Sequence, residues 1–228
     1  MFAPPCKGEE HHKPQQYSDG ELEKLWRFYP TPPRRRKPQI RVAVVIDCEM
    51  GVAESGESEL IRVSVVDYFS CEVLLDSLVW PDVRMSHYST MFSGVTRQAM
   101  EDARRRRSCI FGRDNARNAV CRFVGPDTVV VGHAAQNDLT SLRWIHPSVV
   151  DTLLIELGIR SWEDKAENND TGNGDSQPTG GLSLKALALQ RLNRAIQVKR
   201  KGHDSLEDAM AARDILHWHI AGAIWPDA

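Results

Sequence analysis

Runs of apolar residues divide most of the chain into short buried segments. The run Ile40–Ile46 is almost entirely apolar, which is typical of a strand covered on both faces. Similar runs predict strands at 60–68, 72–79, 128–132 and 149–155, and amphipathic spacing predicts helices at 96–104, 114–124, 136–145, 183–193 and 205–221. Three consecutive strands followed by alternating helices and strands indicate an α/β domain of three layers with a mixed sheet.

Polar, proline-rich and glycine-rich stretches bound this domain. Residues 1–38 are expected to be a mostly disordered basic and proline-rich arm, with at most one short helix at 19–28. Residues 163–181 are rich in Asn, Asp, Gly and Ser and are expected to be a solvated insertion. The globular domain is therefore predicted to span 39–222, with 223–228 as a tail.

Composition places the chain among ordinary globular proteins. Of its 228 residues, 41% are hydrophobic and 26% are charged, so fibrous and membrane classes are not indicated. No apolar run approaches the ~18 residues of a membrane span, and the start lacks the apolar region of a secretory signal. Five scattered cysteines without a C-x-x-C pair favour neither a disulfide framework nor a zinc site. We expect an intracellular protein in a reducing compartment.

The net charge of −2 hides three basic blocks. Residues 34–41 and 191–201 contain basic side chains and no acid, and residues 104–122 contain seven arginines and one acid, Asp114. Such blocks either form a phosphate-binding surface or are solvated faces, and charge alone does not distinguish the two.

Two carboxylates follow the first predicted strand directly. In the sequence Asp47-Cys48-Glu49-Met50-Gly51, an extended backbone points Asp47 and Glu49 to one side and Cys48 to the other. Two acids at the end of a buried strand repel each other and lose hydration unless a cation lies between them. Taken alone, the motif is weak, and two solvated loop acids are the simpler interpretation.

Another candidate acid follows the strand predicted at 128–132. If a helix begins near Gln136, Asp138 shares a face with Leu142 and Ile145 and points towards the sheet. An acid in the first turn of a helix is also favoured by the helix dipole, which requires no function.

A last polar group opens the helix predicted at 205–221. Asp204 and Glu207 have the spacing of a capping box, so the start of a helix accounts for both acids without any further function. Asp208 instead shares a stripe with small and apolar residues suited to packing on a sheet: Ala211, Ala212 and Ile215. His203 lies just before the first turn, where it could either face the same site or be a surface loop histidine.

Together, the acids predict one metal site. Asp47, Glu49, Asp138 and Asp208 all lie at strand ends or helix starts, where α/β sheets place functional sites. Four carboxylates without cysteine or paired histidine favour Mg²⁺ or Mn²⁺ over zinc. Two such ions can stabilise both the attacking and the leaving oxygen of an in-line phosphoryl displacement, and a histidine can accept the proton of the attacking water.

The motifs in combination resemble those of the DEDDh 3′→5′ exonucleases. They are Asp47-Cys-Glu49-Met-Gly51, Gly132-His-Ala-Ala-Gln-Asn-Asp138, and His203 with Asp208 five positions later. Three further segments are similar to the Rex-type RNA exonuclease branch, which includes the interferon-stimulated exonuclease: Phe92-Ser-Gly-Val-Thr96, Val150-Asp-Thr152 and Leu182-Ser-Leu-Lys-Ala-Leu187. The resemblance runs from about Val42 to Trp218.

The resemblance implies a ribonuclease H-like fold, with a central mixed five-stranded sheet flanked by helices, and two divalent cations, Mg²⁺ or Mn²⁺. Carried over position by position, the cation ligands and catalytic carboxylates would be Asp47, Glu49, Asp138 and Asp208. His203 would be the general base. Met50 and Gly51 match positions that meet the terminal nucleotide in the family.

Other residues are candidates for binding substrate. Phe92 is suited to stacking on a base, a contact that tolerates any sequence. The basic run Lys199, Arg200 and Lys201 precedes His203 directly, which favours contacts with backbone phosphates.

The leading hypothesis is a metal-dependent exonuclease that hydrolyses single-stranded RNA from its 3′ end to nucleoside 5′-monophosphates. The resemblance suggests a role in RNA processing, including ribosomal RNA, in the nucleus or nucleolus, and Pro33-Arg-Arg-Arg-Lys37 is compatible with a nuclear localisation segment. A DNA exonuclease with the same catalytic residues is the alternative. An inactive nucleic-acid-binding factor is less favoured because all five catalytic positions are occupied. We expect a monomer that binds single-stranded nucleic acid, RNA in preference to DNA, and no membrane.

Overall fold

A mixed sheet of seven strands forms the centre of the protein. The structure is a computed structural model that describes residues 27–33, 39–168, 181–198 and 202–224. The sheet has the order β6-β4-β3-β2-β7-β9, and β5 pairs with β2 off this path. The bounds are β2 Ala43–Ala53, β3 Ser58–Asp67, β4 Val73–Trp80, β5 Met85–His87, β6 Ile110–Phe111, β7 Val129–Gly132 and β9 Val149–Asp151. β2 and β3 run antiparallel, whereas β2, β7 and β9 run parallel.

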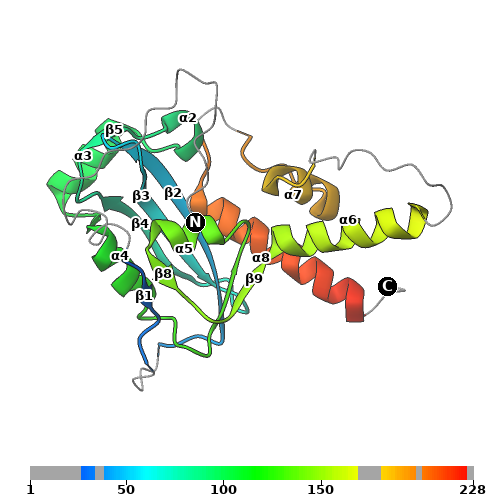
Figure 1. Cartoon of the computed structure of the whole chain (residues 1–228). Coiled ribbons are helices and arrows are strands. Elements are labelled where there is room, and N and C mark those ends of the chain that lie inside the picture. The colour runs from blue at the N-terminus through cyan, green and yellow to red at the C-terminus, as the bar shows by residue number, and fades with distance from the viewer. Residues whose placement is uncertain (1–26, 34–38, 169–180, 199–201, 225–228) are drawn as a thin grey trace, which may run out of the picture.

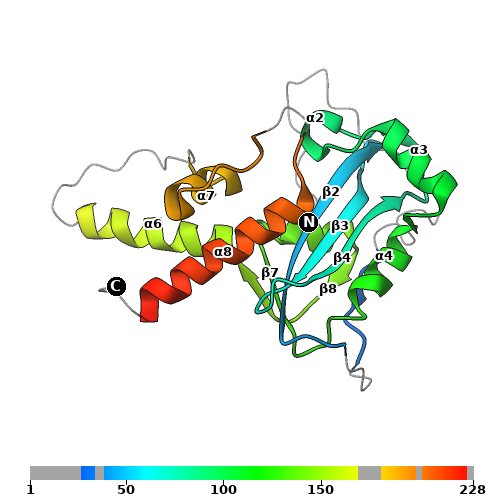
Figure 2. The same cartoon turned by 180° about the vertical axis from the view of Figure 1, so that it is seen from behind.

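Helices cover both faces of this sheet (Figures 1 and 2). On one face lie α8 and, beyond it, α7 and α6; on the other lie α4 and α5. The short helix α2 and helix α3 lie beside β5 at one end of the sheet. The bounds are α2 Thr90–Ser93, α3 Arg97–Arg106, α4 Arg113–Val120, α5 Gln136–Ser141, α6 Thr152–Asn168, α7 Leu184–Leu192 and α8 Ser205–Ile224. Within the described ranges, no helix combines the length and the apolar character needed to cross a bilayer.

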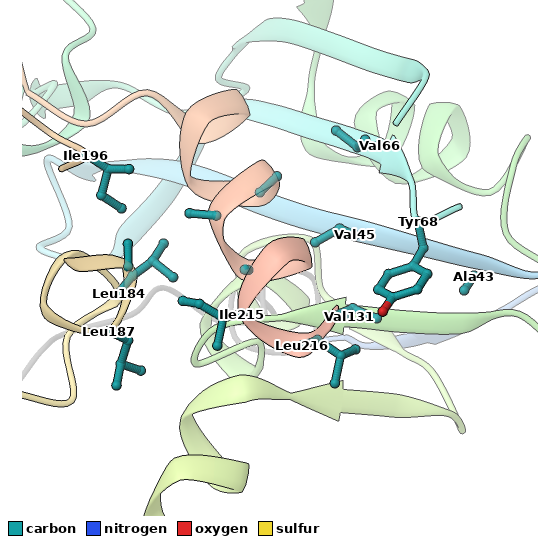
Figure 3. Packing of buried hydrophobic residues seen from close by; sticks show 14 residues of the cluster. Ala43, Val45, Val66, Tyr68, Val131, Leu184, Leu187, Ile196, Ile215 and Leu216 are labelled. Carbon is teal, nitrogen blue, oxygen red and sulfur yellow. The ribbon is translucent and has the colours of Figure 1, made fainter. Parts of the chain in front are cut away.

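Two apolar clusters, one on each face of the sheet, make up most of the core. Figure 3 shows the α8 side, where Ile215 and Leu216 meet Val45 of β2 and Val131 of β7. Small residues of α8 let the helix approach the sheet closely: Ala209, Ala211 and Ala212 are all buried. The cluster on the opposite face packs side chains of α4 and α5 against β2, β3 and β7. This packing fixes the start of α8 above the middle of β2.

The sequence predicted the order of the main elements, and several segments differ. The strand predicted at 40–46 begins at Ala43 and continues to Ala53, so Asp47 and Glu49 lie within it and not after its end. The helix predicted at 136–145 ends at Ser141, and Trp144–Ile145 form strand β8.

The predicted strand 149–155 ends at Asp151, and α6 begins at Thr152. The Asp151 carboxylate accepts a hydrogen bond from the backbone N–H of Leu153 at 2.9 Å, which is typical of a residue that starts a helix. α6 also includes residues 163–168 of the predicted insertion, so that part is helical; residues 169–180 lie outside the described part. Two short strands, β5 and β6, add to the five expected ones.

The predicted disorder of residues 1–38 is wrong for residues 27–33. Strand β1, Tyr29–Pro30, pairs in parallel with β8, Trp144–Ile145. Thr31 is buried, accepts a hydrogen bond from Trp144 Nε1 at 2.9 Å and contacts His146 Nδ1 at 2.7 Å. Proline can extend a sheet only at an edge, which is where β1 lies. Residues 1–26 and 34–38 lie outside the described part of the chain.

Candidate active site

Asp47 and Glu49 lie in the middle of β2 and point to the same side, as alternation along the strand predicted. One oxygen of each, together with one of Asp208, lies within 4.8 Å of the others. Directly after Glu49 the pairing of β2 with β3 shifts register between Glu49 and Met50. Such irregularities bend a strand and redirect its side chains, and they are common next to functional sites.

Asp138 enters the same site from α5. The neighbouring strand β7 runs parallel to β2, so the turn from β7 into α5 delivers Asp138 beside the middle of β2. The Asp138 Oδ1 atom accepts a hydrogen bond from the backbone N–H of Cys48 at 2.8 Å. Cys48, between the two β2 acids, faces the apolar cluster of α4 and α5, as expected for a packing residue. The predicted inward orientation of Asp138 is confirmed, since only 4% of this residue is exposed.

Asp208 comes from the first turn of α8 and is 3% exposed. It lies on the stripe of small residues that packs on the sheet, as predicted. Its two carboxylate oxygens accept hydrogen bonds from the Gln197 side-chain amide at 3.1 and 2.9 Å. The site is therefore assembled from β2, α5 and α8, three elements that are distant in sequence and adjacent in the fold.

Burial holds all four acids towards their protonated forms, and repulsion from the other acids of the cluster adds to this effect for Asp47 and Glu49. Burial raises the pKa of Asp47 well above its usual range, and the charges of Asp138, Asp208 and Glu49 raise it further. Burial, followed by the charge of Asp208, raises the pKa of Glu49 to about 8. Burial likewise raises the pKa of Asp138 to about 8 and that of Asp208 to about 6. Bringing these carboxylates together without a positive charge is therefore unfavourable.

The four carboxylates fit divalent cations. Glu49 Oε1 is buried and finds no hydrogen-bond partner within the described residues, so an acceptor points into the site unsatisfied. An all-oxygen donor set suits hard cations such as Mg²⁺ or Mn²⁺. Arg62, paired with Glu49 across β2 and β3, lowers the pKa of Asp47 and Glu49 but is itself held by Asp76 and Asp204. One arginine leaves most of the negative charge uncompensated.

This repulsion predicts a pH-dependent instability of the metal-free protein. The folded-state pKa of Glu49, about 8, lies above the ~4.3 of an unperturbed glutamic acid. The contribution of Glu49 to the free energy of unfolding is therefore fully present below pH ~4.3 and is lost as the pH rises through 8. In EDTA, Glu49→Gln should therefore become increasingly more stable than the unchanged protein across this interval. Thermal unfolding at several pH values measures the difference, and saturating Mn²⁺ should reverse its sign. A difference in melting temperature between the two proteins that does not change with pH would contradict the repulsion.

His203 lies at the edge of the acidic cluster. Its Nδ1 atom is 3.6 Å from Asp208 Oδ2, and its side chain is 43% exposed. Its backbone N–H donates to the carbonyl oxygen of Phe92 in α2, which fixes the loop that carries it. A half-exposed imidazole beside the carboxylates can exchange a proton with water in the site.

The residues predicted to bind substrate do not all lie at the acidic cluster. Phe92 is 69% exposed and adjoins the His203 loop, as stacking requires. Met50 is half-buried and lines a cavity of about 460 Å³ together with Asn137. A Cβ atom on Gly51 would lie 2.7 Å from Met85 Cε and 2.9 Å from the His87 carbonyl oxygen, so the tight approach of β5 accounts for this glycine. Lys199, Arg200 and Lys201 lie outside the described residues.

Part of the basic block 104–122 is structural. Arg113 is buried and paired with Glu59. Arg117 donates to the Leu142 carbonyl oxygen at 3.0 Å and stacks over Tyr29 of the N-terminal segment. These two arginines hold the fold together, whereas Arg122 and the run Arg104–Arg107, on α3 and in the turn after it, are exposed to solvent.

Sequence reasoning missed Arg62 and Gln197. Arg62 could have been found by aligning β3 against β2, since the two strands place it opposite Glu49. Gln197 lies in the irregular segment between α7 and α8, where no periodicity indicates which way a side chain points. Another buried acid, Asp151, has a structural role: it accepts hydrogen bonds from the backbone N–H groups of Ala134, Ala135 and Leu153.

Comparison with known proteins finds nuclease relatives. No protein-family model matches the chain. RNA exonuclease 3 of Yarrowia lipolytica is 33% identical over 183 residues, which cover 78% of this chain and 21% of that protein. Apoptosis-enhancing nuclease of Homo sapiens is 34% identical over 195 residues, which cover 82% of this chain and 52% of that protein. The chain thus spans about half, or less, of the length of these curated relatives.

A solved structure has the same fold. The Pan2 catalytic unit of Neurospora crassa, which comprises a protease and a nuclease domain, superposes with a TM-score of 0.62 at 19% sequence identity and covers 88% of this chain and 32% of that one. This similarity confirms the predicted ribonuclease H-like α/β fold with its mixed sheet flanked by helices. The sequence relatives, the fold and the acidic site agree, and the chain is similar to 3′→5′ exonucleases of the DEDDh type.

Proposed function

We propose that this chain removes nucleoside 5′-monophosphates from the 3′ end of single-stranded RNA, using two divalent cations, Mg²⁺ or Mn²⁺. One observation carries the proposal: carboxylate oxygens of Asp47, Glu49 and Asp208 lie within 4.8 Å of one another. Asp138 accepts a hydrogen bond from the backbone N–H between the two β2 acids, and His203 lies beside the cluster. Such a cluster is unfavourable on its own and suits the binding of cations that neutralise a phosphodiester.

The chain's own residues would supply positioning and proton transfer. Asp47, Glu49, Asp138 and Asp208 would hold the cations, which when bound stabilise the charge on the attacking and leaving oxygens of an in-line displacement. His203 would accept the proton of the attacking water, since its ring lies beside the cluster and reaches solvent. Phe92, which is exposed, would stack on a base near the 3′ end, and the half-buried Met50 would contact the terminal nucleotide.

RNA is the substrate that the relatives favour. One relative is named RNA exonuclease 3, and structures of Saccharomyces cerevisiae Pan2 contain RNA. The catalytic residues do not distinguish RNA from DNA, because recognition of the 2′-hydroxyl decides that choice. We expect faster digestion of single-stranded RNA than of DNA with the same sequence, 5′ label and cation. Equal or faster loss of the DNA would favour the alternative, a DNA exonuclease on the same fold.

The physiological role is a finer proposal. We propose RNA processing, including ribosomal RNA, by a monomer located in the nucleus or nucleolus. Support comes from the Rex-type motifs and from the basic run Arg34–Lys37. Microscopy of a fluorescent fusion, with the run replaced by alanine in a matched version, tests the location. Uniform cytoplasmic signal from the unchanged fusion would contradict it.

A further inference from the structure

The loop before α8 and the helix α2 touch backbone to backbone. An added Cβ atom at Gly202 would lie 2.2 Å from the Gly94 nitrogen, 2.5 Å from the Gly94 Cα and 2.8 Å from the Thr90 carbonyl oxygen. All three are backbone atoms, so no flexible side chain can move aside to make room. Gly202 also has a φ of +84°, a conformation that residues with a side chain rarely adopt. Only glycine fits this position, for two independent reasons.

The surface that receives Gly202 is a firmly held platform. Ser93 is buried, and its hydroxyl donates to the Tyr88 carbonyl oxygen at 2.6 Å. The Thr90 hydroxyl donates to the Val95 carbonyl oxygen at 2.8 Å, which closes α2 on itself. Tyr88 and Val95 belong to an apolar cluster with Met100 of α3, which anchors both ends of α2 in the body of the protein.

His203, the next residue, is bonded to the same helix. Its backbone N–H donates to the Phe92 carbonyl oxygen, one residue after the Gly202 contact. On the other side, the Asp204 carboxylate accepts from the backbone N–H of Leu206 at 3.1 Å and joins the loop to α8. His203 is therefore held between two fixed elements, although its own side chain is 43% exposed.

We propose that Gly202 is a positioning residue for the general base. Docking of Gly202 on Gly94 holds His203 beside Asp208, and ties it to the element that presents Phe92 to solvent. A base stacked on Phe92 and the imidazole of His203 are then carried by one rigid unit, which sets the distance from the imidazole to the terminal phosphodiester. The inference rests on the proposed exonuclease function.

Gly202→Ala tests the inference. We expect its turnover on 5′-labelled single-stranded RNA with Mn²⁺ to fall by about 10²-fold, since a displacement of about 1 Å in a reacting group can have that effect. Gly158→Ala is the matched control: Gly158 is exposed in α6, and a Cβ atom there meets nothing within 4 Å, so its activity should be unchanged. Cation affinity by calorimetry should be the same for both variants, because the carboxylates are not displaced.

A double-mutant cycle separates positioning from a general structural role. In the His203→Ala background, Gly202→Ala should reduce the remaining activity by less than about threefold, since groups acting as a unit are not additive. Thr90→Ala removes an exposed side chain and its hydrogen bond to the Val95 carbonyl oxygen, and so loosens α2. We expect a smaller loss of turnover, which is again non-additive with His203→Ala. This variant keeps the test decisive if Gly202→Ala does not fold. Equal factors in both backgrounds, or a fully active Gly202→Ala, would overturn the inference. An inactive unchanged protein would instead overturn the proposed function, and the inference with it.

Discussion

Replacing His203 with alanine should lower turnover on single-stranded RNA by about 10²–10⁴-fold, the range that general-base catalysis contributes. The imidazole lies 3.6 Å from Asp208 and is half-exposed, so its loss removes a proton acceptor without opening the core. The four carboxylates that would hold the cations remain, and RNA binding should change little. Single-turnover digestion measures the loss, and calorimetry measures cation binding.

A matched control is available on α8. His217 is exposed on the same helix, away from the acidic cluster, and His217→Ala should digest RNA at the unchanged rate. Undiminished turnover in His203→Ala would remove this residue from the mechanism. A large fall in cation affinity in the same variant would assign it to binding instead of proton transfer.

Asp208→Asn should weaken cation binding and lower turnover by about 10³-fold or more, because metal-assisted charge stabilisation contributes several kcal/mol. The substitution keeps the size of the side chain and one oxygen that accepts from Gln197, while it removes one buried negative charge. The metal-free variant should therefore be at least as stable as the unchanged protein, which separates a loss of function from a loss of fold.

Asp214→Asn is the corresponding control. Asp214 lies on the same helix and pairs with Arg194 and Arg213 near the surface, so the identical chemical change should leave cation binding and turnover intact. Calorimetric affinity for Mn²⁺ that is the same in Asp208→Asn and Asp214→Asn would exclude Asp208 as a ligand.

Periodicity predicted the strands and helices that pack on both faces of the sheet. Ala43–Ile46 and Val129–Gly132 lie between two helical layers, where apolar residues on both sides of a strand leave a clear signal. Elements that depend on polar contacts left no such signal. Helix α6 begins where Asp151 accepts an N–H bond, and β1 is held by Thr31 and Trp144 against β8. These contacts join residues far apart in sequence, so spacing along the chain does not reveal them.

The candidate site was predictable because its residue types are unusual at buried positions. Acids that follow an apolar run or begin a helix stand out in the sequence. Alternation was enough to place Asp47 and Glu49 on one side, although both lie within β2 and not at its end. Residues that support the acids were not predictable. Gln197 reaches Asp208 from an irregular loop, and Gly202 meets Gly94 through backbone atoms alone. Their roles depend on tertiary contacts, which a single sequence does not specify.

The most direct test of the proposed function is a time course on two single-stranded RNAs with 5′ labels, one with a free 3′-hydroxyl and one blocked at the 3′ end. Each is incubated with Mg²⁺, with Mn²⁺ or with EDTA. We expect a ladder that shortens from the free 3′ end, releases nucleoside 5′-monophosphates, and disappears with EDTA or the 3′ block. Internal cleavage of the blocked RNA, or no shortening of the free RNA with either cation, would contradict a metal-dependent 3′→5′ exonuclease.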